Sequence, residues 1–159
     1  GDGGASYDLP LQPAKDITGL VALKADGGTP MGMALRMAKD LIEDRSVIPS
    51  KGYRPAVVLV SDGEPNDDWQ EPMDAFISGG RTAKCQRFAM AIGTSQDDPV
   101  LNRFLSGSGN KVFLASDAGK IRDFFTFLTM TVTTAMLPAA TGVQPASSVT
   151  DLAKELGIL

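Results

Sequence analysis

The chain has 159 residues, of which 43% are hydrophobic and 21% charged, as expected for one globular domain. Its net charge of −4 argues against nucleic acid as a partner, because phosphate binding needs clustered Lys and Arg. It has no histidine, which excludes Ser-His-Asp catalysis and imidazole metal ligands. The densest basic set is Arg81, Lys84 and Arg87, whose helical spacing predicts a solvated face.

The cysteine content and the hydropathy pattern limit the setting of the protein. A single cysteine, Cys85, excludes an internal disulfide, and the apolar run after it predicts a buried, unreactive thiol. No signal peptide is visible, and no apolar run reaches the length of about eighteen residues that a membrane span needs. We therefore expect a cytoplasmic protein with no membrane partner.

The first third of the chain leads to a clear helix. Residues 1–13 predict a turn and a short edge strand, because apolar residues alternate loosely between prolines. Residues 15–28 suit either a short helix or a loop. A helix is then expected from Thr29-Pro30 to about Asp44, because threonine is a good N-cap and proline suits the first helical position.

The next segment, Ala56–Ser61, is the clearest strand in the chain. Its unbroken apolar run, bounded by turn residues, is typical of a parallel strand buried on both faces. Asp62 follows directly and is therefore expected at the carboxyl end of this strand. Ligands of open α/β sheets bind in the crevice beyond such strand ends.

The later elements alternate between helix and strand. They are a helix over 72–78, a strand over 85–92, a helix from Asp98, a strand over 111–115 and a long final helix. We expect Ser116 or Asp117 to cap the final helix, whose predicted apolar face is Ile121, Phe124, Phe125, Leu128 and Val132. The alternation predicts an α/β fold with a doubly wound, mostly parallel sheet and helices on both faces. Residues 137–149 resemble a flexible linker, and residues 150–159 form either a short helix or a tail.

Two polar positions stand where a cation could bind. Thr29 offers a hydroxyl at a helix start, and Asp62 offers a carboxylate at a strand end. Such oxygen ligands suit Mg²⁺, Mn²⁺ or Ca²⁺ rather than Zn²⁺. Each residue also has a structural explanation, Thr29 as an N-cap and Asp62 as part of a turn with Gly63.

The segments Gly27-Gly28-Thr29-Pro30-Met31-Gly32 and Val60-Ser61-Asp62-Gly63-Glu64-Pro65 resemble the second and third metal-site motifs of von Willebrand factor A (VWA) domains. The similarity is greatest to the bacterial tellurium-resistance type, and the order of the run 88–93 and the helix through 124–128 also matches. The resemblance spans residues 7–136. It implies a Rossmann-like fold and a metal-ion-dependent adhesion site, with Mg²⁺ bound by Thr29 and Asp62. An acidic side chain of a partner protein would complete the metal shell.

The family's first motif, Asp-x-Ser-x-Ser, is absent from this sequence. We therefore expect residues 1–136 to be a VWA-like domain that lacks the first strand, first helix and second strand, and so is incomplete at its N-terminus. The Ala56–Ser61 strand would then lie at an exposed edge of the sheet. We also expect the chain in isolation to bind little or no metal, because two protein oxygens hold Mg²⁺ weakly.

The acidic loop after Asp62 has two interpretations. Glu64, Asp67 and Asp68 form either a solvated loop or the rim of a partner-binding site. Trp69 is either an anchor for a partner or a side chain packed back onto the domain. The leading hypothesis is a non-enzymatic protein-interaction module. The alternatives are a metal-independent scaffold that assembles through its sheet edge or terminal helix and, with least support, a Mg²⁺-dependent hydrolase with Asp62 as nucleophile.

Overall fold

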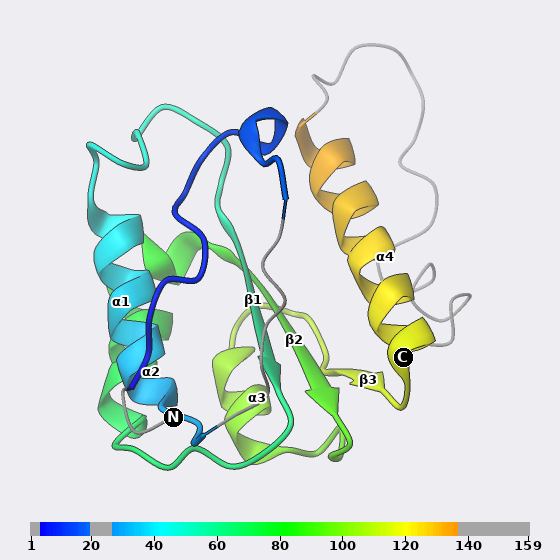
Figure 1. Ribbon diagram of the computed structural model, residues 1–159. Helices are drawn as coiled ribbons and strands as arrows, with labels where there is room; N and C mark the ends of the chain where they lie inside the picture. The colour runs from blue at the N-terminus through cyan, green and yellow to red at the C-terminus, as the bar shows by residue number, and fades with distance from the viewer. Residues whose placement is uncertain (1–3, 20–26, 137–159) are drawn as a thin grey trace.

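A computed structural model describes residues 4–19 and 27–136 (Figure 1). The strands β1 (Ala56–Ser61), β2 (Gln86–Ile92) and β3 (Phe113–Ala115) form a parallel sheet in the order β1-β2-β3. The helices are α1 (Met31–Glu43), α2 (Gln70–Ser78), α3 (Pro99–Phe104) and α4 (Ala118–Met136). A 3-10 turn η1 (Ala14–Asp16) precedes α1, and a second, η2 (Thr82–Lys84), lies between α2 and β2. The predicted α/β class is confirmed. The linker and tail expected over residues 137–159 lie outside the described residues.

Side chains that alternate along the strands separate two apolar cores. Leu59 and Ala89 face the core shared with α1, α2 and α3. Phe88 and Met90 face the opposite core, which they share with α4. Figure 1 shows the consequence, with α4 on one side of the sheet and the other helices on its opposite side. Helices therefore cover both faces, as the sequence predicts.

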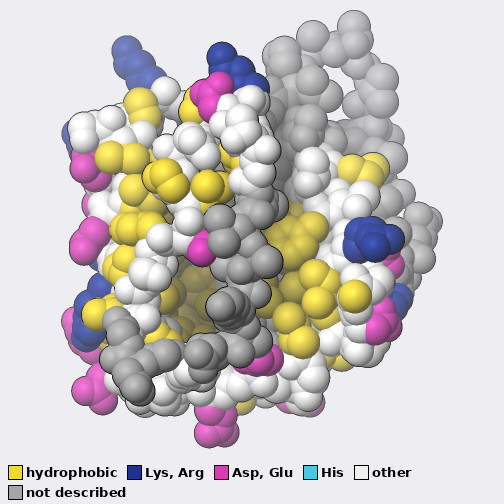
Figure 2. All heavy atoms as spheres, viewed as in Figure 1, with side chains coloured by type: hydrophobic (Ala, Val, Ile, Leu, Met, Phe, Trp, Pro, Cys, Tyr) yellow, Lys and Arg dark blue, Asp and Glu magenta, His cyan; other side chains and the backbone are white. Residues whose placement is uncertain are grey.

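β1 is an edge strand of the described sheet, since β2 is its sole partner there. Four of its six residues are half-buried or buried, but Ala56 is exposed and Val60 keeps 40% of its surface accessible. Figure 2 shows hydrophobic side chains open to view over the sheet between α1 and α4. The prediction of a strand buried on both faces is therefore wrong for β1, while its expected position at the sheet edge is confirmed for the described residues.

The N-terminal segment forms no strand over residues 4–13, so the expected edge strand is wrong there. The segment runs beside α1 instead (Figure 1). The Tyr7 hydroxyl donates to the Met37 carbonyl at 2.9 Å, and the Ala5 N–H donates to the Met33 sulfur at 3.0 Å. Because Tyr7 remains 56% exposed, this segment has no buried sheet face that would favour a strand.

α4 contacts the sheet through a face that differs in part from the expected one. Phe124 and Phe127 are fully buried, whereas Phe125 is 45% exposed, so Phe125 was assigned to the wrong face. Positions 124 and 127 are three apart and lie on one side of a helix, while 125 points away. The side chain of Val132 lies outside the described residues. None of the described helices is long and apolar enough to cross a membrane.

The solvated basic face expected for Arg81, Lys84 and Arg87 is wrong for two of these residues. Arg81 is half-buried, and its guanidinium donates to the carbonyls of Ile42 and Pro49. Arg87 lies on β2, within the strand predicted over 85–92, and it is only 4% exposed. Its guanidinium donates to the carbonyls of Phe104 at 2.9 Å and Ser106 at 2.7 Å. Lys84 is exposed as expected. The alternation of β2 turns Arg87 inward, where backbone carbonyls replace water as its acceptors.

Candidate functional site

The segment before α1 and the loop after β1 meet at the carboxyl end of β1. The Asn66 N–H donates to the Thr29 carbonyl at 3.1 Å. A Cβ on Gly28 would overlap the amide nitrogen of the Asn66 side chain, so glycine permits this close approach. The structure therefore brings together the two segments that the sequence singled out.

A second glycine seats the loop against the helix itself. Gly32 lies in the first turn of α1 and is buried. A Cβ at this position would overlap the carbonyl oxygen of Asp68 and lie 3.0 Å from the Trp69 Cα. Backbone atoms cannot swing aside as a flexible side chain can, so Gly32 is required for the loop to pack this closely.

The cap of α1 comes from this loop and not from Thr29. Pro30 occupies the N-cap position and makes no side-chain cap bond. The Asp67 carboxylate accepts the Gly32 N–H and the Met33 N–H, each at 2.9 Å. These are the donors that an N-cap side chain normally satisfies. The expected capping role of Thr29 is therefore wrong, and Asp67 is bound within its own domain.

The side-chain oxygens of the two predicted metal ligands accept and donate no hydrogen bonds within the described part of the chain. Asp62 is exposed and Thr29 is half-buried, and neither side chain makes a hydrogen bond to another described residue. The neighbouring Ser61 hydroxyl donates to the Gly63 carbonyl at 2.8 Å, which shapes the turn that presents Asp62. A hydroxyl and a carboxylate are suitable donors for Mg²⁺.

These donors are too few to form a metal site by themselves. Among residues 4–19 and 27–136, no group of three or more His, Cys, Asp or Glu side chains is placed to hold a metal ion. Mg²⁺ prefers octahedral coordination by oxygen. Two side-chain oxygens, those of Thr29 and Asp62, are therefore fewer than a magnesium shell requires.

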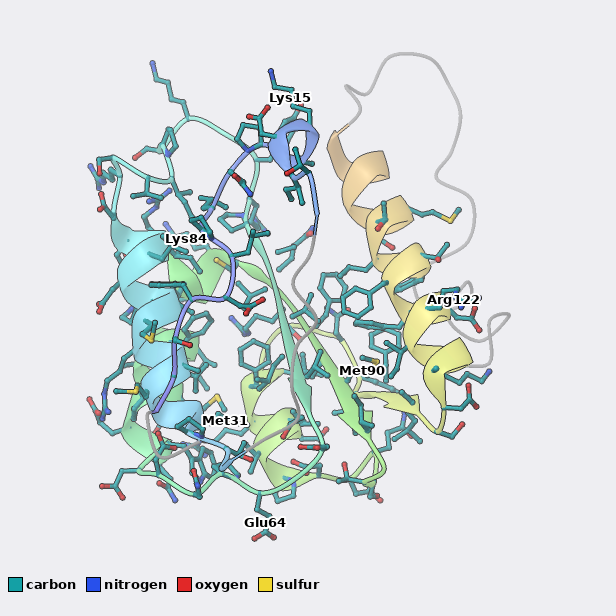
Figure 3. All side chains as sticks on the ribbon, in the orientation of Figure 1. Lys15, Met31, Glu64, Lys84, Met90 and Arg122 are labelled. Carbon is teal, nitrogen blue, oxygen red and sulfur yellow. The ribbon has the colours of Figure 1, made fainter. Side chains whose placement is uncertain are left out.

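Some residues of the expected partner-binding rim are exposed, and others contact the rest of the domain. Glu64 and Asp68 are exposed, and Figure 3 shows Glu64 pointing away from the molecule at this end of the sheet. Trp69 is half-buried against the core under α1 and α2, which favours its packing role over that of a partner anchor. The capping role of Asp67 was not predicted, because no local pattern links it to a helix start more than thirty residues earlier.

Comparison with known families gives one match. The model for the von Willebrand factor type A domain matches residues 12–127, which is most of the chain. The chain therefore belongs to the von Willebrand factor type A domain family. Searches among curated proteins and among solved structures find no significant match. Domains of this family commonly mediate interactions between proteins, and many bind a divalent metal ion where they do so.

Proposed function

We propose that this chain is a non-enzymatic protein-interaction module, whose contact surface is formed by residues 27–33 and 61–69. We call these residues the β1-end surface. One observation carries the proposal: the loop is fixed to the start of α1 through Gly32 and Asp67, while the side chains of Thr29 and Asp62 make no hydrogen bond to the other described residues. A fixed loop that presents uncommitted ligands is preorganised for binding. Membership of the VWA family supports this use.

The charge of the β1-end surface suggests how a partner would bind. Asp62, Glu64 and Asp68 are all exposed there, so an acidic partner side chain would be repelled. A divalent cation reverses this repulsion, because it attracts carboxylates from both sides. We therefore propose a Mg²⁺-dependent mode, with Mn²⁺ or Ca²⁺ as substitutes, in which Thr29, Asp62 and a partner's acid are ligands. We also propose that, among VWA domains, this chain is most similar to the tellurium-resistance type.

The proposal makes a direct prediction about the affinity of the isolated chain for Mg²⁺. With only Thr29 and Asp62 as ligands, the chain alone should bind Mg²⁺ too weakly to saturate in a calorimetric titration. Tight binding at one ion per chain would contradict this expectation and would mean that further ligands exist within the chain. An Asp62→Ala variant would then show whether Asp62 is one of them.

Affinity capture from cell extract tests the partner-binding role. The wild-type chain, Asp62→Ala and Asp40→Ala are immobilised and compared in Mg²⁺ and in EDTA. Asp40 is a matched control, because it is an exposed aspartate on α1 outside the β1-end surface. We expect a protein that the wild type and Asp40→Ala capture in Mg²⁺, and that both EDTA and Asp62→Ala release. Equal capture by wild type and Asp62→Ala would refute the proposed surface.

A metal-independent scaffold is the second candidate, and the unpaired edge of β1 in the described sheet favours it. Open strand edges can pair with another chain through backbone hydrogen bonds. This function predicts capture that resists EDTA and the Asp62→Ala change. Loss of capture after removal of residues 137–159 would assign the assembly to the C-terminal segment instead of the strand edge.

A further inference from the structure

A pocket of about 450 Å³ lies at the amino end of β2, far from the β1-end surface. Its polar lining includes Arg54, Lys84, Arg87, Ser108 and Asn110. No acidic residue is among the described residues that line it. In Figure 3 the labelled Lys84 lies near the amino end of β2 and Glu64 beyond the carboxyl end of β1, so this pocket and the proposed partner surface are separate.

The positive charges at this pocket form no ion pair with a carboxylate of the described residues. Arg54 and Lys84 are exposed and make no ion pair or hydrogen bond through their side chains to the described residues. Arg87 is almost fully buried, yet its guanidinium bonds only backbone carbonyls and forms no ion pair within the described part of the chain. Carbonyl dipoles satisfy its donors without cancelling its charge.

This local charge is opposite to that of the whole chain. The protein carries a net charge of −4, but Arg54, Lys84 and Arg87 line one pocket whose described lining residues include no acid. The Ser108 hydroxyl accepts the Asn110 N–H at 3.1 Å, so its own proton can be donated to a ligand. Cations and a hydroxyl donor around a small hollow match the chemistry of a phosphate group.

We propose that this pocket binds a small molecule that carries a phosphate group. Arg54 and Lys84 contact the phosphate oxygens, and Arg87 contributes its charge from the wall of the pocket. The volume is larger than a phosphate group requires, so the rest of the ligand can occupy it. Cys85, which also lines the pocket, is buried, and desolvation raises the pKa of its thiol. Its predicted burial is confirmed.

The test uses calorimetric titration with pyrophosphate and with adenosine monophosphate, which separate phosphate recognition from recognition of a larger ligand. Arg54→Gln and Lys84→Gln are each expected to weaken binding about tenfold, because each removes a charge-assisted contact. Both residues are exposed, so neither change removes core packing. Lys15→Gln and Arg122→Gln are matched controls, since both remove exposed cations that do not line the pocket.

The outcomes are distinct. Saturable binding that falls in the pocket variants, persists in the controls and weakens with added salt supports the proposal. Changes in the amide NMR signals of residues 107–110 would locate the ligand at this pocket. The proposal is overturned if neither probe binds at millimolar concentration, or if pocket and control variants lose affinity equally. Because Asp62 lies elsewhere, neither outcome alters the test of the β1-end surface.

Discussion

The starts of α1 and α4 are both capped by an aspartate, but at very different separations along the chain. Asp117 immediately precedes α4 and accepts the N–H groups of Gly119 and Lys120 at 2.8 and 3.1 Å. Asp67 accepts the equivalent pair at the start of α1 from a loop that follows β1. The first cap stabilises one helix end. The second also fixes the β1-end surface, because the same bonds join the loop to the helix.

This difference separates two kinds of loop. The turn before α4 is held by neighbours in sequence and can form as soon as the helix does. The loop over residues 63–69 takes its position from α1, so its geometry depends on the tertiary fold. A change at the start of α1 should therefore alter the loop over residues 63–69, whereas a change at the start of α4 should not.

The largest expected effect comes from Gly32→Ala. Alanine normally favours a helix over glycine, but here its Cβ would overlap the backbone of Asp68. We expect the free energy of unfolding to fall by about 2 kcal/mol, as in other overpacked sites. Chemical denaturation followed by circular dichroism measures this loss.

Gly63→Ala is the control for that change. Gly63 has ample space for a Cβ, and its φ is not positive, so this variant should be nearly neutral. Equal stability of the Gly32→Ala and Gly63→Ala proteins would show that the loop does not pack against α1 as described.

A smaller effect is expected from Asp67→Ala. Removing the carboxylate leaves the N–H groups of Gly32 and Met33 without their acceptor, at a cost of about 1 kcal/mol. Asp68→Ala is a close control, because the Asp68 side chain is exposed and makes no hydrogen bond to another described residue. In thermal unfolding, the melting temperature of Asp67→Ala should be clearly lower than that of Asp68→Ala. If both lose the same stability, the distant cap contributes nothing beyond general charge effects.

These two caps also show how much of the structure could be predicted from the sequence. The strand over 56–61, the start of α3 at Asp98 and a cap of α4 at Ser116 or Asp117 follow from neighbouring residues. The structure confirms the first two and identifies Asp117 as the cap. The role of Asp67 depends on a contact between segments that no local pattern joins. Arg87 falls within the strand predicted over 85–92, but its inward turn depends on acceptors in a later segment, the carbonyls of Phe104 and Ser106, which no local pattern links to it.

The exposure of β1 marks another limit of prediction from sequence. Its apolar run and that of β2 give the same pattern, yet β2 is buried and β1 lies at the edge of the described sheet. An apolar run predicts a strand, but the neighbours on each side decide how far it is buried. Local sequence could likewise place Thr29 and Asp62 at one end of the sheet. The number of further ligands around them depends on which other segments pack at that end, and local sequence does not determine this.

The smallest expected effect concerns the local cap of α4 and its dependence on pH. Hydrogen bonds from the Lys120 N–H and from the Ser116 hydroxyl lower the pKa of Asp117 below its ordinary value of 3.8. A lowered folded-state pKa means that the cap stabilises the protein fully above 3.8 and loses this contribution as the pH falls through the folded-state pKa.

Asp117→Asn should therefore lower the melting temperature slightly near neutral pH, by less than Asp67→Ala, because solvent screens this exposed carboxylate. The gap between wild type and variant should close as the pH is lowered from about 6 to about 2. Asp123→Asn is the control, because the Asp123 side chain is in the same helix and makes no hydrogen bond to another described residue. Its melting temperature should differ less from that of the wild type. A gap for Asp117→Asn that stays constant across this range would mean that the ionised carboxylate does not cap α4, and the contrast with α1 would then rest on Asp67 alone.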